Sequence, residues 1–142
     1  MMLASWMGSD FTNDDLVRQS SIIDDYSHTL LGQEEYQGFP CYKIQLIPKP
    51  EAGVVWGKLI LWVTVKEYMD LKEEYYDEEG VLVRTMVGSK PKNFDGHLLP
   101  SFWEMVPQNK PGNKTTFEYT ELDFDIDITS SFFSLQNMNR IR

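Results

Sequence analysis

The chain has 142 residues, which is the size of one ordinary domain with a sizeable core. Its 22 acidic and 13 basic residues give a formal net charge of -9. This charge repels phosphate backbones and anionic lipid surfaces, so we expect no nucleic-acid partner. The single cysteine, Cys41, excludes an internal disulfide. We interpret it as a small buried side chain, with a reactive thiol as the alternative.

The N-terminal part predicts a short helix over residues 13–18, the only regular helix of any length that we expect. Thr12 and Asp15 have the spacing of a capping box, with Asp in place of Glu. Met1 is followed by neither a basic segment nor an apolar run of signal-peptide length. Two explanations of this missing signal-peptide pattern stay open: a cytosolic protein, or a chain cut from a longer precursor. A first strand is predicted over residues 26–36.

The next strand is predicted from alternation. Tyr42, Ile44 and Leu46 alternate with polar residues after a turn near Gly38, and Pro48 stops the run. A half-buried strand of an antiparallel sheet has this pattern.

The most apolar and β-branched stretch, residues 54–65, is predicted to be the central strand. Leu59, Leu61 and Val63 should point to one face of the sheet, because side chains alternate with period 2. The opposite face should receive Trp56, Lys58, Ile60, Trp62 and Thr64. Both faces therefore carry apolar side chains that need a cover.

A β-hairpin is predicted from residues 71–76 and 81–87, which flank a turn ending in Gly80. Glycine supplies the positive φ of such a turn at little cost. The acidic residues around this turn are interpreted as solvated; they are Glu73, Glu74, Asp77, Glu78 and Glu79. Residues 89–96 are polar and are predicted to form a turn-rich connection.

The following strand should place Leu99, Trp103 and Met105 on one face, with Pro100 near an edge or its beginning. A last long strand is predicted over residues 115–128. Beyond it, the apolar side chains of a capped turn are expected to act as plugs; they are Phe132, Phe133 and Leu135. About seven strands with little helix indicate a mainly β fold, an antiparallel sheet that curls or closes.

The sequence offers no catalytic or metal-binding motif. An EF-hand loop starting at Asp123 would put Ile128 where glycine belongs, so a solvated strand face competes with a metal site there. His28 and His97 have no ligand neighbours in sequence. The supply of 8 Phe, 7 Tyr, 7 Met and 4 Trp fits either an ordinary core or a ligand cavity.

Residues 5–16 resemble the Gly-Ser-Asp-Phe-(Ser/Thr)-x-x-Asp-Leu signature of bacterial LolA-like outer-membrane lipoprotein-sorting proteins. The resemblance extends over nearly the whole chain, because later elements occur in the order that the family shows. These elements are residues 42–49, Trp62-Val63, the turn at residues 76–80, the Pro100 strand with Glu104-Met105, Thr116 and the closing Phe133.

The resemblance implies a curved antiparallel half-barrel whose apolar cavity receives acyl chains, with no catalysis and no cofactor. It also implies a periplasmic protein, with residues 1–142 as a single domain that is the C-terminal portion of the family domain. We expect the signal peptide, a first helix and early strands to precede it in a longer precursor. The expected partners are lipid or lipoprotein acyl chains, an envelope protein, or a second copy bound through an exposed sheet edge.

The predicted cavity wall combines this resemblance with the alternation of the strands. Its candidates are Tyr42, Ile44, Leu46, Leu59, Leu61, Val63, Leu99, Trp103 and Met105. Two other functions stay open, because the same architecture resembles lipid-responsive regulators of envelope stress: an interaction or sensing module, and a purely structural envelope domain.

Overall fold

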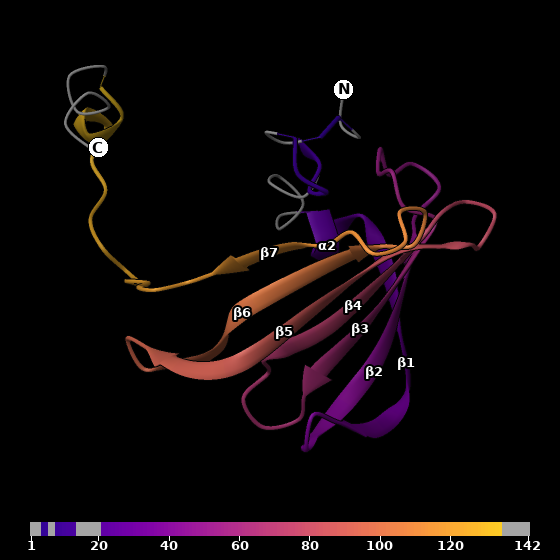
Figure 1. The fold of residues 1–142 in the computed structure, drawn as a ribbon, viewed down its shortest axis with the longest axis horizontal. Helices are drawn as coiled ribbons and strands as arrows, with labels where there is room; N and C mark the ends of the chain where they lie inside the picture. The colour runs from indigo at the N-terminus through magenta and orange to yellow at the C-terminus, as the bar shows by residue number, and fades with distance from the viewer. Residues whose placement is uncertain (1–3, 6–7, 14–20, 135–142) are drawn as a thin grey trace.

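The computed structural model describes residues 4–5, 8–13 and 21–134. Seven strands form one open, curved antiparallel sheet in the order of the sequence, β1-β2-β3-β4-β5-β6-β7 (Figure 1). The strands are β1 (Tyr26–Tyr36), β2 (Phe39–Pro48), β3 (Lys58–Thr64), β4 (Asp70–Tyr76), β5 (Leu82–Phe94), β6 (His97–Pro107) and β7 (Thr115–Glu118). Two short helices are described, α2 (Ser21–Asp24) and the 3-10 helix η2 (Ser130–Phe133). The predicted fold class, a curved antiparallel sheet with little helix, is confirmed.

The two faces of the sheet are defined by its register. Leu61 pairs with Ile44 of β2 and with Glu73 of β4, so these three side chains share one face, which we call the Leu61 face. Trp62 lies on the opposite Trp62 face. The buried cluster of the Leu61 face consists of Tyr26, Leu46, Trp56, Leu59, Leu61 and Tyr75. The cluster with Trp62 consists of Cys41, Ile60, Trp62, Met69 and Leu71.

These clusters confirm that both faces are apolar and that residues 59–63 alternate as predicted. Trp56 is the exception, because it packs in the Leu61 cluster and not with Trp62. The reason is that β3 begins only at Lys58, so Trp56 lies in the preceding connection, where strand alternation does not apply. Cys41 is fully buried, as the sequence indicated, and burial raises the pKa of its thiol.

The β4–β5 hairpin has the predicted turn. Gly80 adopts a φ of 81°, and Asp77 Oδ1 accepts hydrogen bonds from the backbone N–H groups of Glu79 and Val81. The predicted connection at residues 89–96 is wrong, because β5 continues to Phe94. Polar side chains do not prevent backbone pairing, and β5 pairs with β6 from Ser89 to Phe94 at every residue except Lys90.

A tight turn at Asp95 and Gly96, with φ values of 48° and 87°, closes the β5–β6 hairpin. Within β5, Lys90 has a φ of 51°, which interrupts regular strand geometry. The Ser101 hydroxyl donates a 2.8 Å hydrogen bond to the Lys90 carbonyl oxygen. This bond holds the hairpin at its irregular point.

The C-terminal predictions are corrected by the structure. The last strand ends at Glu118 and the chain continues without regular structure to residue 129, so the strand predicted over residues 115–128 is mostly wrong. Within the described residues, no further strand pairs with β7 on its outer edge. Phe132 and Phe133 are 45% and 70% exposed and do not plug the sheet. Leu135 lies outside the described residues.

The N-terminal helix prediction falls on residues 13–18, of which only Asn13 is described. The described helix α2 lies at Ser21–Asp24, between the predicted helix and the predicted first strand. Thr12 forms an isolated antiparallel bridge with Ser5. Neither helix in the described part of the chain has the length and apolar character needed to cross a bilayer.

Candidate functional site

The predicted cavity wall lies largely on one face. The pairs Tyr42–Val63, Ile44–Leu61 and Leu46–Leu59 bring six of its members together on β2 and β3. Two more candidates, Trp103 and Met105 on β6, lie on the same face. Met105 pairs with Met86 of β5, which in turn pairs with Glu73 of β4, and Trp103 lies two residues before Met105 and pairs with Gly88. The ninth candidate, Leu99, pairs with Lys92 beyond the irregular point at Lys90, and it lies closer to the β5–β6 turn than Trp103 and Met105.

The Leu61 face is covered by the chain itself in this structure. Leu46, Leu59 and Met105 are fully buried, whereas Tyr42, Ile44 and Val63 are half-buried. The cover includes Trp56 together with side chains that pack against the cluster from α2 and from the β2–β3 connection; these are Ile22, Val54 and Val55. The sequence analysis expected the apolar side chains of both faces to need a cover, and on this face the chain itself supplies one.

Two charged side chains, Glu73 and Arg84, are buried among these apolar side chains. Glu73 is 4% exposed and Arg84 is 3% exposed. The Arg84 guanidinium lies 4.5 Å from the ring centroid of Trp56 and 4.2 Å from that of Tyr75, and the Tyr75 hydroxyl donates to the Glu73 carboxylate. Such stacking suits arginine, whose planar cation packs on aromatic faces. The interpretation of Glu73 as solvated is therefore wrong.

The signal for this buried group was present in the sequence. Glu73 and Tyr75 alternate along β4, and β4 pairs with the apolar central strand, so both side chains follow the face of their β3 partners. Runs of charged residues beside turns are commonly solvated, and the interpretation of Glu73 followed that rule instead of the alternation along β4. Glu74, on the Trp62 face, is half-buried. Burial raises its pKa, but hydrogen bonds from Lys72 and Tyr76 outweigh burial and lower it overall.

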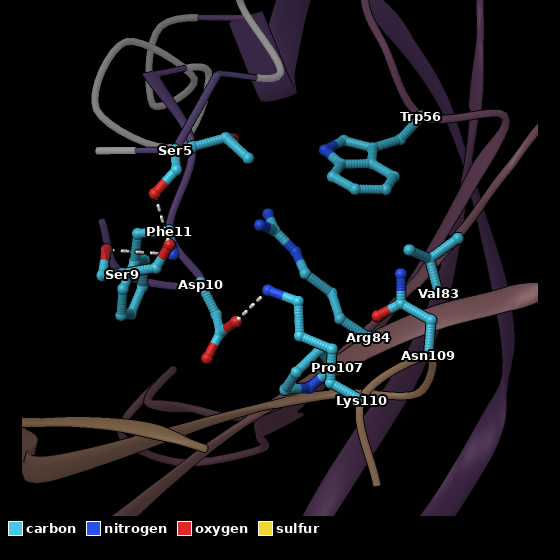
Figure 2. A pocket seen from close by; sticks show the side chains of 11 residues that line it. Ser5, Ser9, Asp10, Phe11, Trp56, Val83, Arg84, Pro107, Asn109 and Lys110 are labelled. Carbon is cyan, nitrogen blue, oxygen red and sulfur yellow. Dashed lines mark hydrogen bonds and ion pairs between the residues drawn. The ribbon is translucent and has the colours of Figure 1, made fainter. Parts of the chain in front are cut away.

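A cavity of about 260 Å³ lies beside the Leu61 cluster, with Trp56 and Arg84 in its wall (Figure 2). Four segments far apart in sequence surround it: the N-terminal arm, the β2–β3 connection, the start of β5, and the end of β6 with the β6–β7 connection. The lining residues are Ser5, Ser9, Asp10, Phe11, Thr12, Trp56, Val83, Arg84, Pro107, Asn109 and Lys110.

Asp10 fixes the N-terminal arm against the β6–β7 connection. Its carboxylate accepts a 3.0 Å bond from Lys110 Nζ and a 2.8 Å bond from the Thr115 hydroxyl. The hydrogen bond from Lys110, followed by that from Thr115, lowers the pKa of Asp10. The next side chain, Phe11, packs edge-on against Phe117 with 5.5 Å between ring centroids. Two residues of the Gly-Ser-Asp-Phe motif thus attach the arm to the sheet.

The indole N–H of Trp56 is a buried donor in the wall of the cavity. Trp56 is 6% exposed, and Nε1 has no hydrogen-bond partner within the described residues. Figure 2 shows this nitrogen on the side of the ring that faces Ser5 and the Arg84 guanidinium. The cavity therefore presents N–H donors from Trp56, Arg84 and Lys110. No group of three or more His, Cys, Asp or Glu side chains suited to a metal ion occurs among the described residues.

Three solved structures share this architecture, and they place the chain among proteins with the LolA-like fold. A DUF1329 family protein from Desulfovibrio piger matches with a TM-score of 0.84 and 24% identity over 95% of this chain. A domain described as that of an outer membrane lipoprotein-sorting protein from Vibrio parahaemolyticus matches with a TM-score of 0.79 and 25% identity over 96%. A LolA superfamily protein from Nitrosomonas europaea matches with a TM-score of 0.72 and 22% identity over 96%. The predicted likeness to LolA-like proteins is thereby confirmed.

Within this fold, the chain belongs to a protein family described as "Uncharacterized protein", whose model matches residues 1–140. No curated protein matches the sequence. The chain spans 55%, 57% and 60% of the lengths of the three solved structures.

Proposed function

We propose that this chain is a non-enzymatic carrier module for lipid or lipoprotein acyl chains, with the Leu61 face as its binding surface. One observation carries the proposal: eight of the nine predicted wall residues share one apolar face of an open, curved sheet. The Vibrio parahaemolyticus neighbour, described as an outer membrane lipoprotein-sorting protein domain, supports the same class of function. We place the module in the bacterial periplasm, acting without a cofactor and exchanging its cargo with an envelope protein.

In this proposal residues 1–142 act as one domain, corresponding to the C-terminal portion of a LolA-like domain. The driving force is the burial of hydrocarbon. Each methylene group removed from water contributes about 0.8 kcal/mol, so ten of them contribute about 8 kcal/mol. That energy must exceed the cost of displacing the present cover of the face. The cover comes from the four-residue helix α2 and from the β2–β3 connection, which are small elements outside the sheet.

The β2–β3 connection is suited to such a displacement. Its Ala52 N–H bonds to the Lys49 carbonyl oxygen within the connection, and its Gly57 N–H bonds to the Tyr76 carbonyl oxygen of the sheet. Val54 and Val55 lie between these two attachment points. Their side chains can leave the Leu61 face without breaking the ladders between β2, β3 and β4.

A second candidate function is an envelope interaction or stress-sensing module, and the edge strand β1 favours it. Within the described residues, β1 pairs only with β2. Leu30 and Leu31 on this strand are 59% and 47% exposed. An open edge with exposed apolar side chains can accept a strand from an envelope protein or from a second copy.

Lipid recovered from the purified protein separates these functions. The protein would be isolated from bacterial cells without detergent, extracted with organic solvent and analysed by mass spectrometry. We expect close to one lipid per chain in the wild type and a clear loss in Val63→Ser, because Val63 is a half-buried member of the face. Leu31→Ser, on the exposed edge strand, is the matched control and should retain its lipid. A wild-type protein without lipid would contradict the carrier function and favour the interaction module.

A further inference from the structure

The cavity beside the Leu61 face contains a buried donor that nothing in the described chain satisfies. Trp56 Nε1 has no hydrogen-bond partner among the described residues, although the side chain is only 6% exposed. Leaving a buried N–H without an acceptor costs about 1–3 kcal/mol. The indole nitrogen faces the cavity (Figure 2), so an acceptor atom placed there would recover this energy.

The charges around the cavity favour an acceptor that is also an anion. Arg84 and Lys110 line the cavity with positive charge, and Asp10 is the acidic side chain among the lining residues. Asp10 is already held by Lys110 and Thr115, so its carboxylate is turned to the protein's own donors. An ammonium has three N–H donors, and the bond to Asp10 uses one of those on Lys110. The chain is acidic overall, yet the side chains that line this cavity include two cations and one anion.

We propose that this cavity binds an oxyanion, a phosphate or carboxylate group, at the head of an amphiphile whose chain lies on the Leu61 face. Trp56 and Arg84 would donate from the buried side and Lys110 from the rim. The placement of the ligand's hydrocarbon on the Leu61 face rests on the proposed carrier function, whereas the anion site stands on the cavity alone.

The size and position of the cavity match a head group. Pockets for drug-sized ligands have volumes of about 300–1,000 Å³. A cavity of about 260 Å³ is smaller and accepts a head group but not a whole lipid. Trp56 and Val83 line the cavity and also pack in or against the Leu61 cluster, so the two regions are contiguous. A ligand can therefore place its anion in the cavity and its hydrocarbon on the face.

The test compares three probes: dodecyl phosphate, the uncharged dodecyl maltoside and inorganic phosphate, with both detergents below their micelle concentrations. Calorimetric titration measures affinity, and the indole ¹H–¹⁵N signal of Trp56, assigned by its absence in Trp56→Phe, reports on the site. We expect dodecyl phosphate to bind about tenfold more tightly than dodecyl maltoside, because charge-assisted hydrogen bonds add about 1.4 kcal/mol or more.

Two variants locate the site, and a third is the control. Lys110→Gln removes a rim charge, and Trp56→Phe keeps an aromatic ring but removes the N–H. Each should weaken dodecyl phosphate binding about threefold or more, with little change for dodecyl maltoside. Lys114→Gln is matched to Lys110→Gln, because the Lys114 side chain is 58% exposed against 54% for Lys110, and it pairs with Glu104 away from the cavity. It should leave both affinities unchanged.

Equal affinity for the two detergents would overturn the anion site and leave the carrier function standing. Dodecyl phosphate binding that survives both Lys110→Gln and Trp56→Phe would also overturn it. A third outcome is that inorganic phosphate alone shifts the Trp56 signal and neither detergent binds. The cavity would then be a site for free phosphate, and both the proposed amphiphile ligand and the carrier function would be contradicted. No response to any probe would overturn both.

Discussion

Asp10, in the N-terminal arm, accepts a 3.0 Å hydrogen bond from Lys110, which follows it by 100 residues in the sequence. This contact joins the N-terminal arm to the connection between β6 and β7, and it closes one side of the cavity. A motif that the sequence offered only as a family signature therefore has a structural role, because its acidic residue attaches the arm to the sheet.

Asp10→Asn should destabilise the protein by about 1 kcal/mol at neutral pH, because the ion pair with a half-exposed lysine is partly screened by solvent. The pKa of Asp10 is lowered in the folded state. Its contribution to stability is therefore present above the ordinary carboxyl pKa and is lost as the pH falls through the folded value. Thermal melts of wild type and variant should differ at pH 7 and converge in acid. Asp123→Asn, at an exposed position, is the control and should have little effect at either pH.

Gly80→Val should lower the free energy of unfolding by about 1 kcal/mol or more, because a β-branched residue is disfavoured at positive φ. The φ of Gly80 is 81°, and a Cβ there would meet nothing within 4 Å, so the cost is conformational and not steric crowding by neighbours. Glu79→Ala, in the same turn, should change stability little. Urea titrations that give equal midpoint shifts for the two variants would contradict this account of the turn.

Leu61→Glu should abolish binding of an apolar fluorescent dye and of any retained lipid, and it should lower stability by about 3 kcal/mol. The reason is that Leu61 is 8% exposed, and a carboxylate placed there loses its hydration without a partner designed for it. Leu31→Glu makes the same chemical change at a site that is 47% exposed and should leave stability and dye binding near the wild-type values. Light scattering should be recorded in parallel, because Leu31→Glu would dissociate a dimer that forms through β1.

Tyr76 should ionise about two pH units above an ordinary tyrosine. Burial, followed by the hydrogen bond and the negative charge of Glu74, raises the pKa of Tyr76 to about 12 from 10.0. The unfolded chain loses this proton near the ordinary value, so the contribution of Tyr76 is complete below pH 10 and is lost as the pH rises through the folded pKa. A spectrophotometric tyrosine titration of wild type minus Tyr76→Phe should show this late transition.

Glu74→Gln tests the cause of that raised pKa. The variant removes the negative charge beside the Tyr76 hydroxyl and keeps a hydrogen-bond acceptor, so the transition should move toward the ordinary tyrosine value. Glu78→Gln, at an exposed position in the following turn, should leave the transition in place. A Tyr76 transition that stays put in Glu74→Gln would assign the whole shift to burial.

Most strands of the sheet follow from local patterns in the amino-acid sequence. Alternation of apolar and polar residues located β2, the apolar and β-branched composition of residues 54–65 located β3, and Gly80 located the turn of the β4–β5 hairpin. The same alternation assigned the two faces of β3, because the side-chain period of a strand is fixed by its covalent geometry. Eight of the nine candidate wall residues consequently lie on one face. The strand at residues 89–94 was missed because its pairing is made by the backbone, which leaves no apolar pattern in polar side chains.

The cover of the Leu61 face and the cavity beside it arise from contacts between segments far apart in the sequence. Trp56 was assigned to the wrong face because it precedes β3, where strand alternation does not apply. Glu73 was assigned to solvent because it belongs to a charged run beside a turn, although its pairing with Leu61 places it on the buried face. The cavity needs Asp10, Arg84 and Lys110 together, and these belong to three segments whose spacing in sequence carries no signal. Their proximity arises when the arm, the sheet and the β6–β7 connection pack against one another, which is a long-range contact that no local pattern encodes.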